Sequence, residues 1–177
     1  MRFFFPFSLL FSPDGRRVVA LHSGAISLID AENPRQALRI PDYAKTFADP
    51  FKGATFLGAA FATDSKLVYL SGGDKGNIII FDTEKKEKID DISLNQPIDN
   101  QNFEESFTSD LILNSAKNEL LVLDRAHFRM VRIDLATKKI TASIPVGRQP
   151  FGLSLSPDKK YAFVANVGLY AYPLVPG

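Results

Sequence analysis

The sequence predicts an all-β fold, a β-propeller of four-stranded antiparallel blades. Its main support is an internal repeat: FPFSLLFSPD at 5–14 returns as QPFGLSLSPD at 149–158, with six identical positions at an offset of 144 residues. Two weaker copies are FLGAAFATD, which ends at Asp64, and TSDLILNSA, which ends at Ala116. Successive copies are 50, 52 and 42 residues apart, and each is an apolar strand followed by a polar turn. This period is typical of propeller blades.

The repeat divides a single domain, 1–177, into three and a half blades. Their expected ranges are about 3–41, 54–94 and 107–146, with a half blade at about 149–172. Because closed propellers contain about four to eight blades, we expect a partial ring, of seven blades when complete. Two explanations stay open: the chain is a piece of a longer protein, which we favour, or a half that pairs with a second copy.

The elements of one blade follow from the fourth copy and the second copy. GLSLS (152–156) is a short apolar strand, and the Ser-Pro-Asp-Lys turn follows it, in which Pro presets φ and Asp accepts a backbone hydrogen bond. YAFVAN (161–166) is rich in aromatic and β-branched residues, which favour a second strand. The second copy adds a third strand, NIIIFD (77–82), and a polar outer strand near 87–94.

Three predicted third strands end in an aspartate, at Asp30, Asp82 and Asp134. A carboxylate at the end of a strand accepts hydrogen bonds from the backbone of the next turn. We therefore interpret these aspartates as turn caps and assign no catalytic residue among them. The same interpretation covers the aspartates of the first turn, which are Asp14, Asp64 and Asp158.

Composition restricts the function classes only loosely. The chain has 21 Lys and Arg against 20 Asp and Glu and contains no long basic run, so its charge gives little support to nucleic-acid binding. It has no cysteine, which excludes disulfides and thiolate chemistry. No segment approaches the ~18 apolar residues of a membrane span. The opening MRFFFPFSLLF resembles a signal peptide, but no small-residue cleavage site follows, and we interpret it as an inner strand.

With these motifs, the chain resembles the YVTN-type, YncE-like propellers, which are similar in plan to WD-repeat rings. The resemblance rests on FSPDGRRVVAL (11–21), SGGDKGNIIIFD (71–82) and above all on 133–168, with its T-x-K turn, P-V-G-x-x-P and S-P-D. It implies a bacterial protein in a periplasmic or extracellular setting. FLGAAF (56–61) is also similar to a subgroup in which the propeller precedes an alkaline-phosphatase-like phosphoesterase domain, whose catalytic half would then lie outside this sequence.

Candidate ligand-binding residues cluster in one loop. Asp124, Arg125, His127 and Arg129 place polar groups where the other copies have Gly or small residues. The two arginines could clamp a carboxylate or phosphate, or they are solvated or paired with acidic residues of the connectors. Those connectors, 41–53 and 95–106, are long loops of the kind that often form a binding face.

A metal site is a second hypothesis. Equivalent positions at the end of the second strands are His22, Gly72, Asp124 and Asn166, and three of them can ligate a hard cation such as Ca²⁺. Gluconolactonase-type propellers hold a divalent ion near the ring axis with ligands of this kind, and a complete ring would be needed to bring these residues together. The alternative is that His22, Asp124 and Asn166 hydrogen-bond turns and that no cofactor is present.

The leading functional hypothesis is a non-catalytic scaffold or binding module that presents a loop-built face to a protein or small ligand. The alternative is part of a hydrolase, either a metal-dependent lactonase-like propeller or the accessory domain of a phosphoesterase. The expected partner for ring closure is the remainder of the same chain or, in a homodimer, a second copy.

Overall fold

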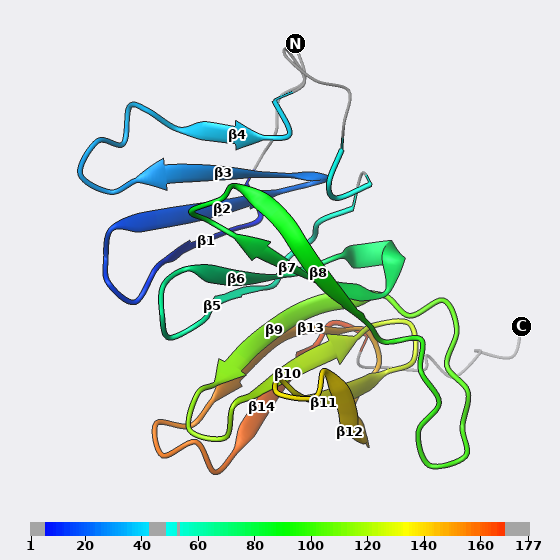
Figure 1. Ribbon diagram of the computed structural model, residues 1–177. Helices are drawn as coiled ribbons and strands as arrows, with labels where there is room; N and C mark the ends of the chain where they lie inside the picture. The colour runs from blue at the N-terminus through cyan, green and yellow to red at the C-terminus, as the bar shows by residue number, and fades with distance from the viewer. Residues whose placement is uncertain (1–5, 43–48, 53, 169–177) are drawn as a thin grey trace, which may run out of the picture.

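The computed structural model describes residues 6–42, 49–52 and 54–168. Within these residues the chain forms three four-stranded antiparallel sheets and one two-stranded sheet, and each sheet keeps its strands in sequence order (Figure 1). The predicted fold class, an all-β partial propeller of four-stranded antiparallel blades, is confirmed. Residues 3–5 and 169–172, at the two ends of the expected blades, lie outside the described residues, as do 43–48 of the first connector.

The strands have the following bounds. The first sheet contains β1 (Ser8–Phe11), β2 (Arg17–His22), β3 (Ala25–Asp30) and β4 (Leu38–Ile40). The second contains β5 (Ala59–Phe61), β6 (Leu67–Ser71), β7 (Asn77–Asp82) and β8 (Glu87–Ser93), with a 3₁₀ turn, η1 (Gly73–Lys75), between β6 and β7. The third contains β9 (Thr108–Asn114), β10 (Glu119–Asp124), β11 (Arg129–Asp134) and β12 (Lys139–Pro145). The last contains β13 (Pro150–Leu155) and β14 (Ala162–Asn166).

The hydrophobic core is divided into layers between successive sheets. Successive side chains of a strand point to opposite faces, and both faces of the middle sheets are covered. In β6, Val68 and Leu70 pack toward the first sheet, while Tyr69 packs toward the third. In β7, Ile79 packs toward the first sheet, and its neighbour Ile78 packs toward the third. The uninterrupted apolar run of β7 therefore reflects burial on both faces.

The predicted aspartate caps are present in the turns. Asp30, Asp82 and Asp134 each accept a backbone N–H of the following turn at 2.7–2.9 Å. Asp14 and Asp158 do the same in the first turn of their blades, from the N–H groups of Arg16 and Lys160. These carboxylates stabilise the turns, as the sequence interpretation expected.

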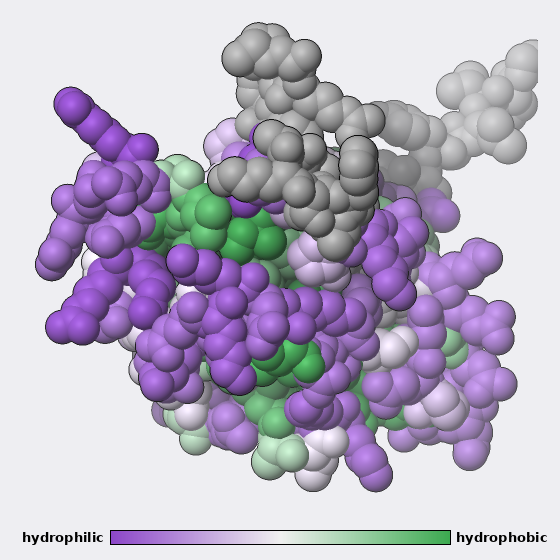
Figure 2. All heavy atoms as spheres, turned by 45° about the horizontal axis from the view of Figure 1, so that its top comes forward, coloured by the Kyte–Doolittle hydropathy of each residue, from purple (hydrophilic) through white to green (hydrophobic). Residues whose placement is uncertain are grey.

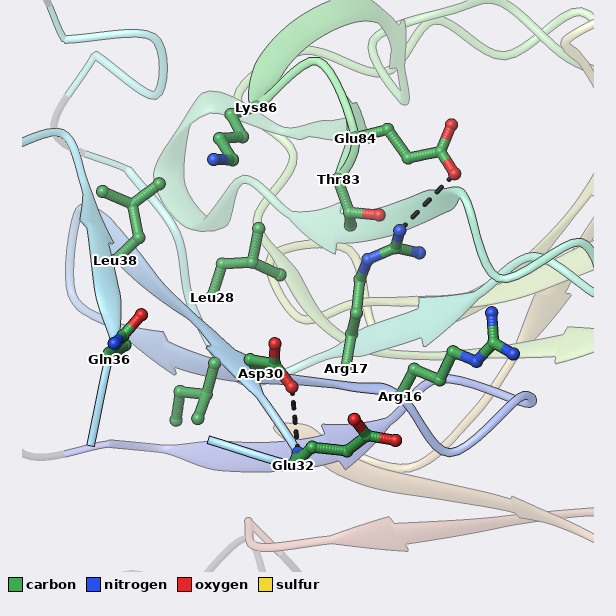
Figure 3. A pocket seen from close by; sticks show the side chains of 11 residues that line it. Arg16, Arg17, Leu28, Asp30, Glu32, Gln36, Leu38, Thr83, Glu84 and Lys86 are labelled. Atoms are coloured by element: carbon green, nitrogen blue, oxygen red, sulfur yellow. Dashed lines mark hydrogen bonds and ion pairs between the residues drawn. The ribbon is translucent and has the colours of Figure 1, made fainter. Parts of the chain in front are cut away.

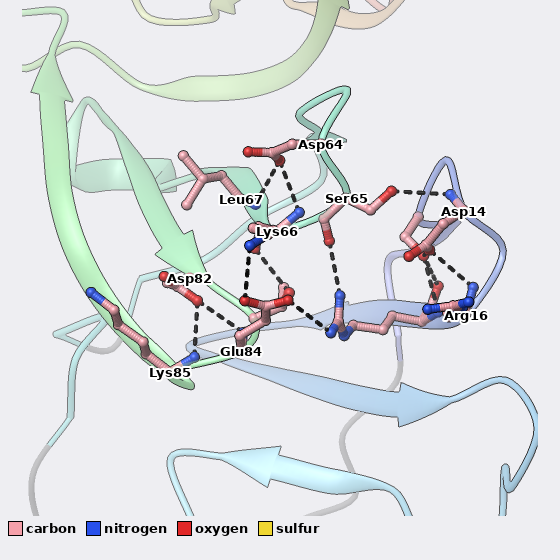
Figure 4. Close-up of polar contacts among 12 residues, drawn as sticks. Asp14, Arg16, Asp64, Ser65, Lys66, Leu67, Asp82, Glu84 and Lys85 are labelled. Atoms are coloured by element: carbon pink, nitrogen blue, oxygen red, sulfur yellow. Dashed lines mark hydrogen bonds and ion pairs between the residues drawn. The ribbon is translucent and has the colours of Figure 1, made fainter.

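Polar contacts connect the first two sheets at the turn end of the strands (Figure 4). Ser65 accepts the Asp14 backbone N–H at 3.0 Å, and its carbonyl oxygen accepts a hydrogen bond from the Arg17 guanidinium at 3.1 Å. Arg17 also pairs with Glu84 at 3.4 Å, and Lys66 approaches the other oxygen of that carboxylate at 3.5 Å. One arginine therefore connects β2 to two turns of the next blade.

No helix in the described part of the chain is long and apolar enough to cross a membrane.

Candidate functional site

One end of the strands, here named the loop face, carries the connectors between blades and the turns between second and third strands. In Figure 1 it lies on the side of η1, opposite the β1–β2 and β3–β4 turns. The segments that build it are 23–24, 72–76, 94–107, 125–128 and 146–149. Its first feature is a close approach of two loops: Gly76 has a positive φ of 61°, and a Cβ there would lie 2.6 Å from the Ser106 carbonyl oxygen. Only glycine fits at this position.

Four phenylalanines, one from each sheet, converge on the loop face where the inner strands begin. Phe56 is at the centre: its ring centroid lies 5.5 Å from that of Phe7, 5.1 Å from that of Phe107 and 6.4 Å from that of Phe151. The contacts with Phe107 and Phe151 are edge-to-face, which is a favoured geometry for aromatic pairs. Phe7 is 44% and Phe151 38% exposed. We name these four residues the aromatic cluster.

Polar and small residues border the aromatic cluster. Arg125 lies with its guanidinium carbon 6.0 Å from the Phe107 ring centroid, and its Nε donates a hydrogen bond to Gln149 Oε1. Gly73, in η1, has a φ of 55°, and a Cβ there would approach Phe56 Cβ to 3.4 Å. The cluster is therefore a partly open apolar surface with an arginine at its edge.

A buried ion pair begins at the residue before Arg125. Asp124 is fully buried, and its Oδ2 accepts a hydrogen bond from Arg129 Nε at 2.8 Å. The other oxygen accepts the Phe107 backbone N–H at 3.1 Å. Arg129 is 2% exposed, and it also donates to the Leu94 carbonyl at 3.0 Å. The two arginines of the predicted clamp therefore do not face the same site. Arg129 binds an internal carboxylate, and Arg125 lies at the edge of the aromatic cluster.

His127 and Phe103 complete this charged group. His127 Nδ1 lies 2.9 Å from Asp124 Oδ2, and its side chain is 28% exposed. The Phe103 ring packs edge-to-face on the imidazole at 5.2 Å and lies 3.4 Å from the Arg129 guanidinium carbon, a cation–π contact. Phe103 belongs to the second connector, so this contact ties the connector to the β10–β11 turn.

The pKa of Asp124 is lowered. Burial, the largest single influence, raises the pKa of the carboxyl, but hydrogen bonds from Arg129, the Phe107 N–H and His127 together outweigh it. By contrast, burial raises the pKa of Asp110, in β9, and hydrogen bonds from the Leu153 and Leu111 backbone N–H groups oppose that rise only in part. Both carboxyls act as acceptors for neighbouring backbone.

The three residues of the predicted metal set lie at the ends of β2, β10 and β14. His22 is buried, with Nε2 2.9 Å from Ser27 Oγ. Asn166 donates to the Val164 carbonyl at 3.3 Å. No group of three or more His, Asp or Glu side chains within the described ranges is arranged to hold a metal ion. Asp124 already shares its two oxygens with the Phe107 N–H, Arg129 and His127, so a cation there would lie close to the positive charge of Arg129.

A concavity lies away from the loop face, between β3–β4 of the first sheet and the β7–β8 turn of the second (Figure 3). It has a volume of about 780 Å³. Leu28 and Leu38 form its apolar part, and Arg17 and Glu84, which pair with each other, lie on its wall. Figure 2 shows hydrophobic surface between hydrophilic rims on this side of the molecule.

Sequence reasoning found the charged loop but missed the aromatic cluster. The signal is present: Phe7, Phe56, Phe107 and Phe151 stand at or just before the start of each inner strand. Phe7 and Phe151 align in the repeat, but Phe56 and Phe107 lie further from the turn of their copies, and the pairing of β9 with β10 shifts register near Phe107. A strict alignment of the copies therefore hides the correspondence.

Comparison with known proteins shows the fold but no family. No family model matches the chain, and no curated protein matches it. Similar solved structures include a hydrazine synthase from Kuenenia stuttgartiensis (TM-score 0.70, 16% identity) and a periplasmic gluconolactonase from Pseudomonas aeruginosa (TM-score 0.66, 21% identity). A chain of a mitotic checkpoint complex is also similar (TM-score 0.72, 14% identity).

These matches cover most of this chain but less than half of each neighbour. They span 92%, 92% and 91% of this chain, and 43%, 47% and 46% of the respective neighbours. The neighbours are β-propeller proteins, which supports the propeller architecture. At these identities the likeness extends to the fold alone.

Proposed function

We propose that this chain is a non-catalytic β-propeller module that binds a ligand on its loop face. The observation that carries the proposal is the aromatic cluster, which gathers one phenylalanine from each of four sheets and leaves two of them more than a third exposed. Apolar surface that collects contributions from several elements is a common feature of binding sites. The buried Asp124–Arg129 pair beside it supports the surrounding loops.

The test uses N-phenyl-1-naphthylamine, a neutral aromatic probe that fluoresces on apolar surfaces. Replacing both Phe7 and Phe151 by Ala removes the exposed half of the cluster. The matched control replaces by Ala both Ile89 and Ile144, which are 44% and 37% exposed but lie on the outer strands β8 and β12, outside the cluster. We expect about tenfold weaker probe binding in the first variant, equivalent to about 1.4 kcal/mol, and unchanged affinity in the control. Equal effects in both variants would refute the proposal.

A hydrolase context is the second candidate, and one contact favours it. Asp124 orients His127 through Nδ1 at 2.9 Å, which is how a carboxylate positions an imidazole for general-base work. His127→Gln in a chain that also contains the remaining blades would then abolish hydrolysis of lactone or phosphoester substrates, whereas the binding module would show no such turnover to lose. A divalent ion at His22, Asp124 and Asn166 belongs to this second candidate, and chelation would remove it.

The family assignment and the cellular location are likewise proposals. The pattern of 133–168 supports a YVTN-type propeller exported from a bacterial cell. Fractionation of cells that express the natural gene tests the location.

A further inference from the structure

We infer that the loop face selects a small aromatic anion, a planar apolar group that carries a carboxylate or sulfonate. This inference rests on the proposed function, because it names the class of ligand that the aromatic cluster would take. The observation behind it is the arginine charge next to the aromatic cluster.

Arg125 borders the cluster with available donors, and Arg148 lies on the neighbouring connector, over the ring of Phe128. Among the described residues, the only hydrogen bond of the Arg125 guanidinium uses Nε, toward Gln149. Both terminal nitrogens of its planar fork therefore remain for a ligand, and that fork matches the two oxygens of a carboxylate. Arg148, on the connector that contains Gln149, is exposed and lies with its guanidinium carbon 5.9 Å from the Phe128 ring centroid. No ion pair joins either arginine to an acidic side chain within the described ranges.

The nearest buried carboxylate does not cancel this charge. Asp124 is next to Arg125 in sequence, but its Oδ2 is bound to the guanidinium of Arg129 at 2.8 Å. The pair is neutral as a unit, so it does not cancel the positive charge that Arg125 places beside the Phe107 ring, and Arg148 adds a second positive charge on the neighbouring connector. An anion gains from this field, and a neutral ring system gains only from the apolar contact.

The positive charge of Arg125 lies beside the aromatic cluster. Arg125 lies against the ring of Phe107, which packs edge-to-face on Phe56 at 5.1 Å. Gln149 connects Arg125 to the start of β13, where Phe151 contacts the same central ring at 6.4 Å. A ligand with its ring on the exposed phenylalanines would therefore bring an attached anionic group within reach of the arginine edge.

The experiment compares two probes with the same ring system. 8-Anilino-1-naphthalenesulfonate carries a sulfonate, and N-phenyl-1-naphthylamine lacks it. In the double variant Arg125→Gln and Arg148→Gln, we expect sulfonate-probe binding to weaken about tenfold and neutral-probe binding to stay unchanged. The control, Arg16→Gln with Arg35→Gln, removes the same charge from turns at the opposite end of the strands and should alter neither affinity.

The outcomes separate the two proposals. If both probes bind equally well to the arginine variant and to the wild type, yet both weaken in the Phe7→Ala, Phe151→Ala variant, the anion inference is wrong and the binding module stands. If the neutral probe is insensitive to the phenylalanine substitutions, the proposed function itself is overturned. Sulfonate-probe binding should also weaken as salt rises, because ions screen exposed charges; affinity that is independent of salt contradicts the inference.

Discussion

Asp124 illustrates how the environment of one residue decides its role. A buried carboxylate is costly unless hydrogen bonds and an opposite charge compensate it. Here the compensation comes from Arg129, five residues along the same hairpin, and from the backbone N–H of Phe107 at the end of the second connector. The residue thus fixes the connector against the β10–β11 turn, and its charge is balanced by Arg129 rather than by Arg125.

Substitution of Asp124 should destabilise the protein in a manner that depends on pH. Asp124→Asn leaves Arg129 buried without its counter-charge, and removing one partner of a buried pair costs about 3–5 kcal/mol. The pKa of Asp124 in the fold lies below its unfolded value of about 3.9. Its stabilising contribution is therefore complete above that value and is lost as pH falls through the lower folded pKa.

Urea unfolding from pH 7 to pH 2 measures this. The stability difference between wild type and Asp124→Asn should be largest at neutral pH and should shrink in acid. Asp74→Asn, at an exposed position in η1, serves as the control and should change stability by less than about 0.5 kcal/mol. A difference that stays constant over the whole pH range would contradict the assigned role.

For single residues, the sequence predicts the chemical character of a loop better than it predicts which side chains contact each other. The loop 124–129 was identified because polar residues replace the small ones of other copies. Which of its arginines is internal depends on the three-dimensional position of Leu94 and Ser106, whose oxygens surround Arg129 at 3.0 and 3.4 Å. Those contacts join residues far apart in the chain, and periodicity carries no information about them.

Individual elements depend on contacts between neighbouring sheets. Arg17, in β2, donates to the carbonyl of Ser65 and pairs with Glu84, so it connects the first blade to two turns of the second. The exposed ion pair contributes little, but removal of the arginine leaves the Ser65 carbonyl oxygen without this donor. Arg16 lies next in sequence, is exposed, and makes no side-chain hydrogen bond to another described residue.

This adjacent pair of arginines gives a matched test of the inter-blade contact. Arg17→Ala should lower the free energy of unfolding by about 1–2 kcal/mol, whereas Arg16→Ala should change it by less than about 0.5 kcal/mol. Thermal or urea unfolding of both variants at the same pH measures the difference. Similar losses in the two variants would show that the contact with Ser65 does not hold the blades together.

Strands were more predictable than the segments between them. Residues 25–30 form β3, and the third strands β7 and β11 end at Asp82 and Asp134 as expected, because aspartate caps mark their ends in the sequence. The 3₁₀ turn at Gly73–Lys75 and the packing of Phe103 on Arg129 were not foreseen. Connector structure depends on which side chains it meets, and no repeat constrains it.

At the scale of the whole molecule, the first and last sheets of the described residues each pack against another described sheet on one side only. Leu9 and Phe11 of β1 are exposed, as are Phe163 of β14 and Tyr161 just before it, all between 58% and 65%. In a propeller such faces are covered by adjacent blades. Exposed apolar faces and strand edges favour association.

We therefore expect this chain, prepared alone, to associate reversibly through its outer sheets. Sedimentation velocity over a range of concentrations should show a rising average mass. Phe11→Ser with Phe163→Ser should shift the association to at least tenfold higher concentration, whereas Phe7→Ser with Phe151→Ser should shift it much less. A wild-type monomer at all concentrations would contradict this expectation.

The separation of the core into layers has a consequence for how stability is distributed. Each layer belongs to only two adjacent sheets, so the folding free energy is close to a sum of terms for single sheets and for neighbouring pairs. The β13–β14 hairpin packs against one neighbouring sheet, through Leu153, Leu155 and Val164. Each middle sheet packs against two neighbours. Cooperativity therefore weakens toward the hairpin, and the arginine edge of the loop face borders the part of the molecule that is easiest to open.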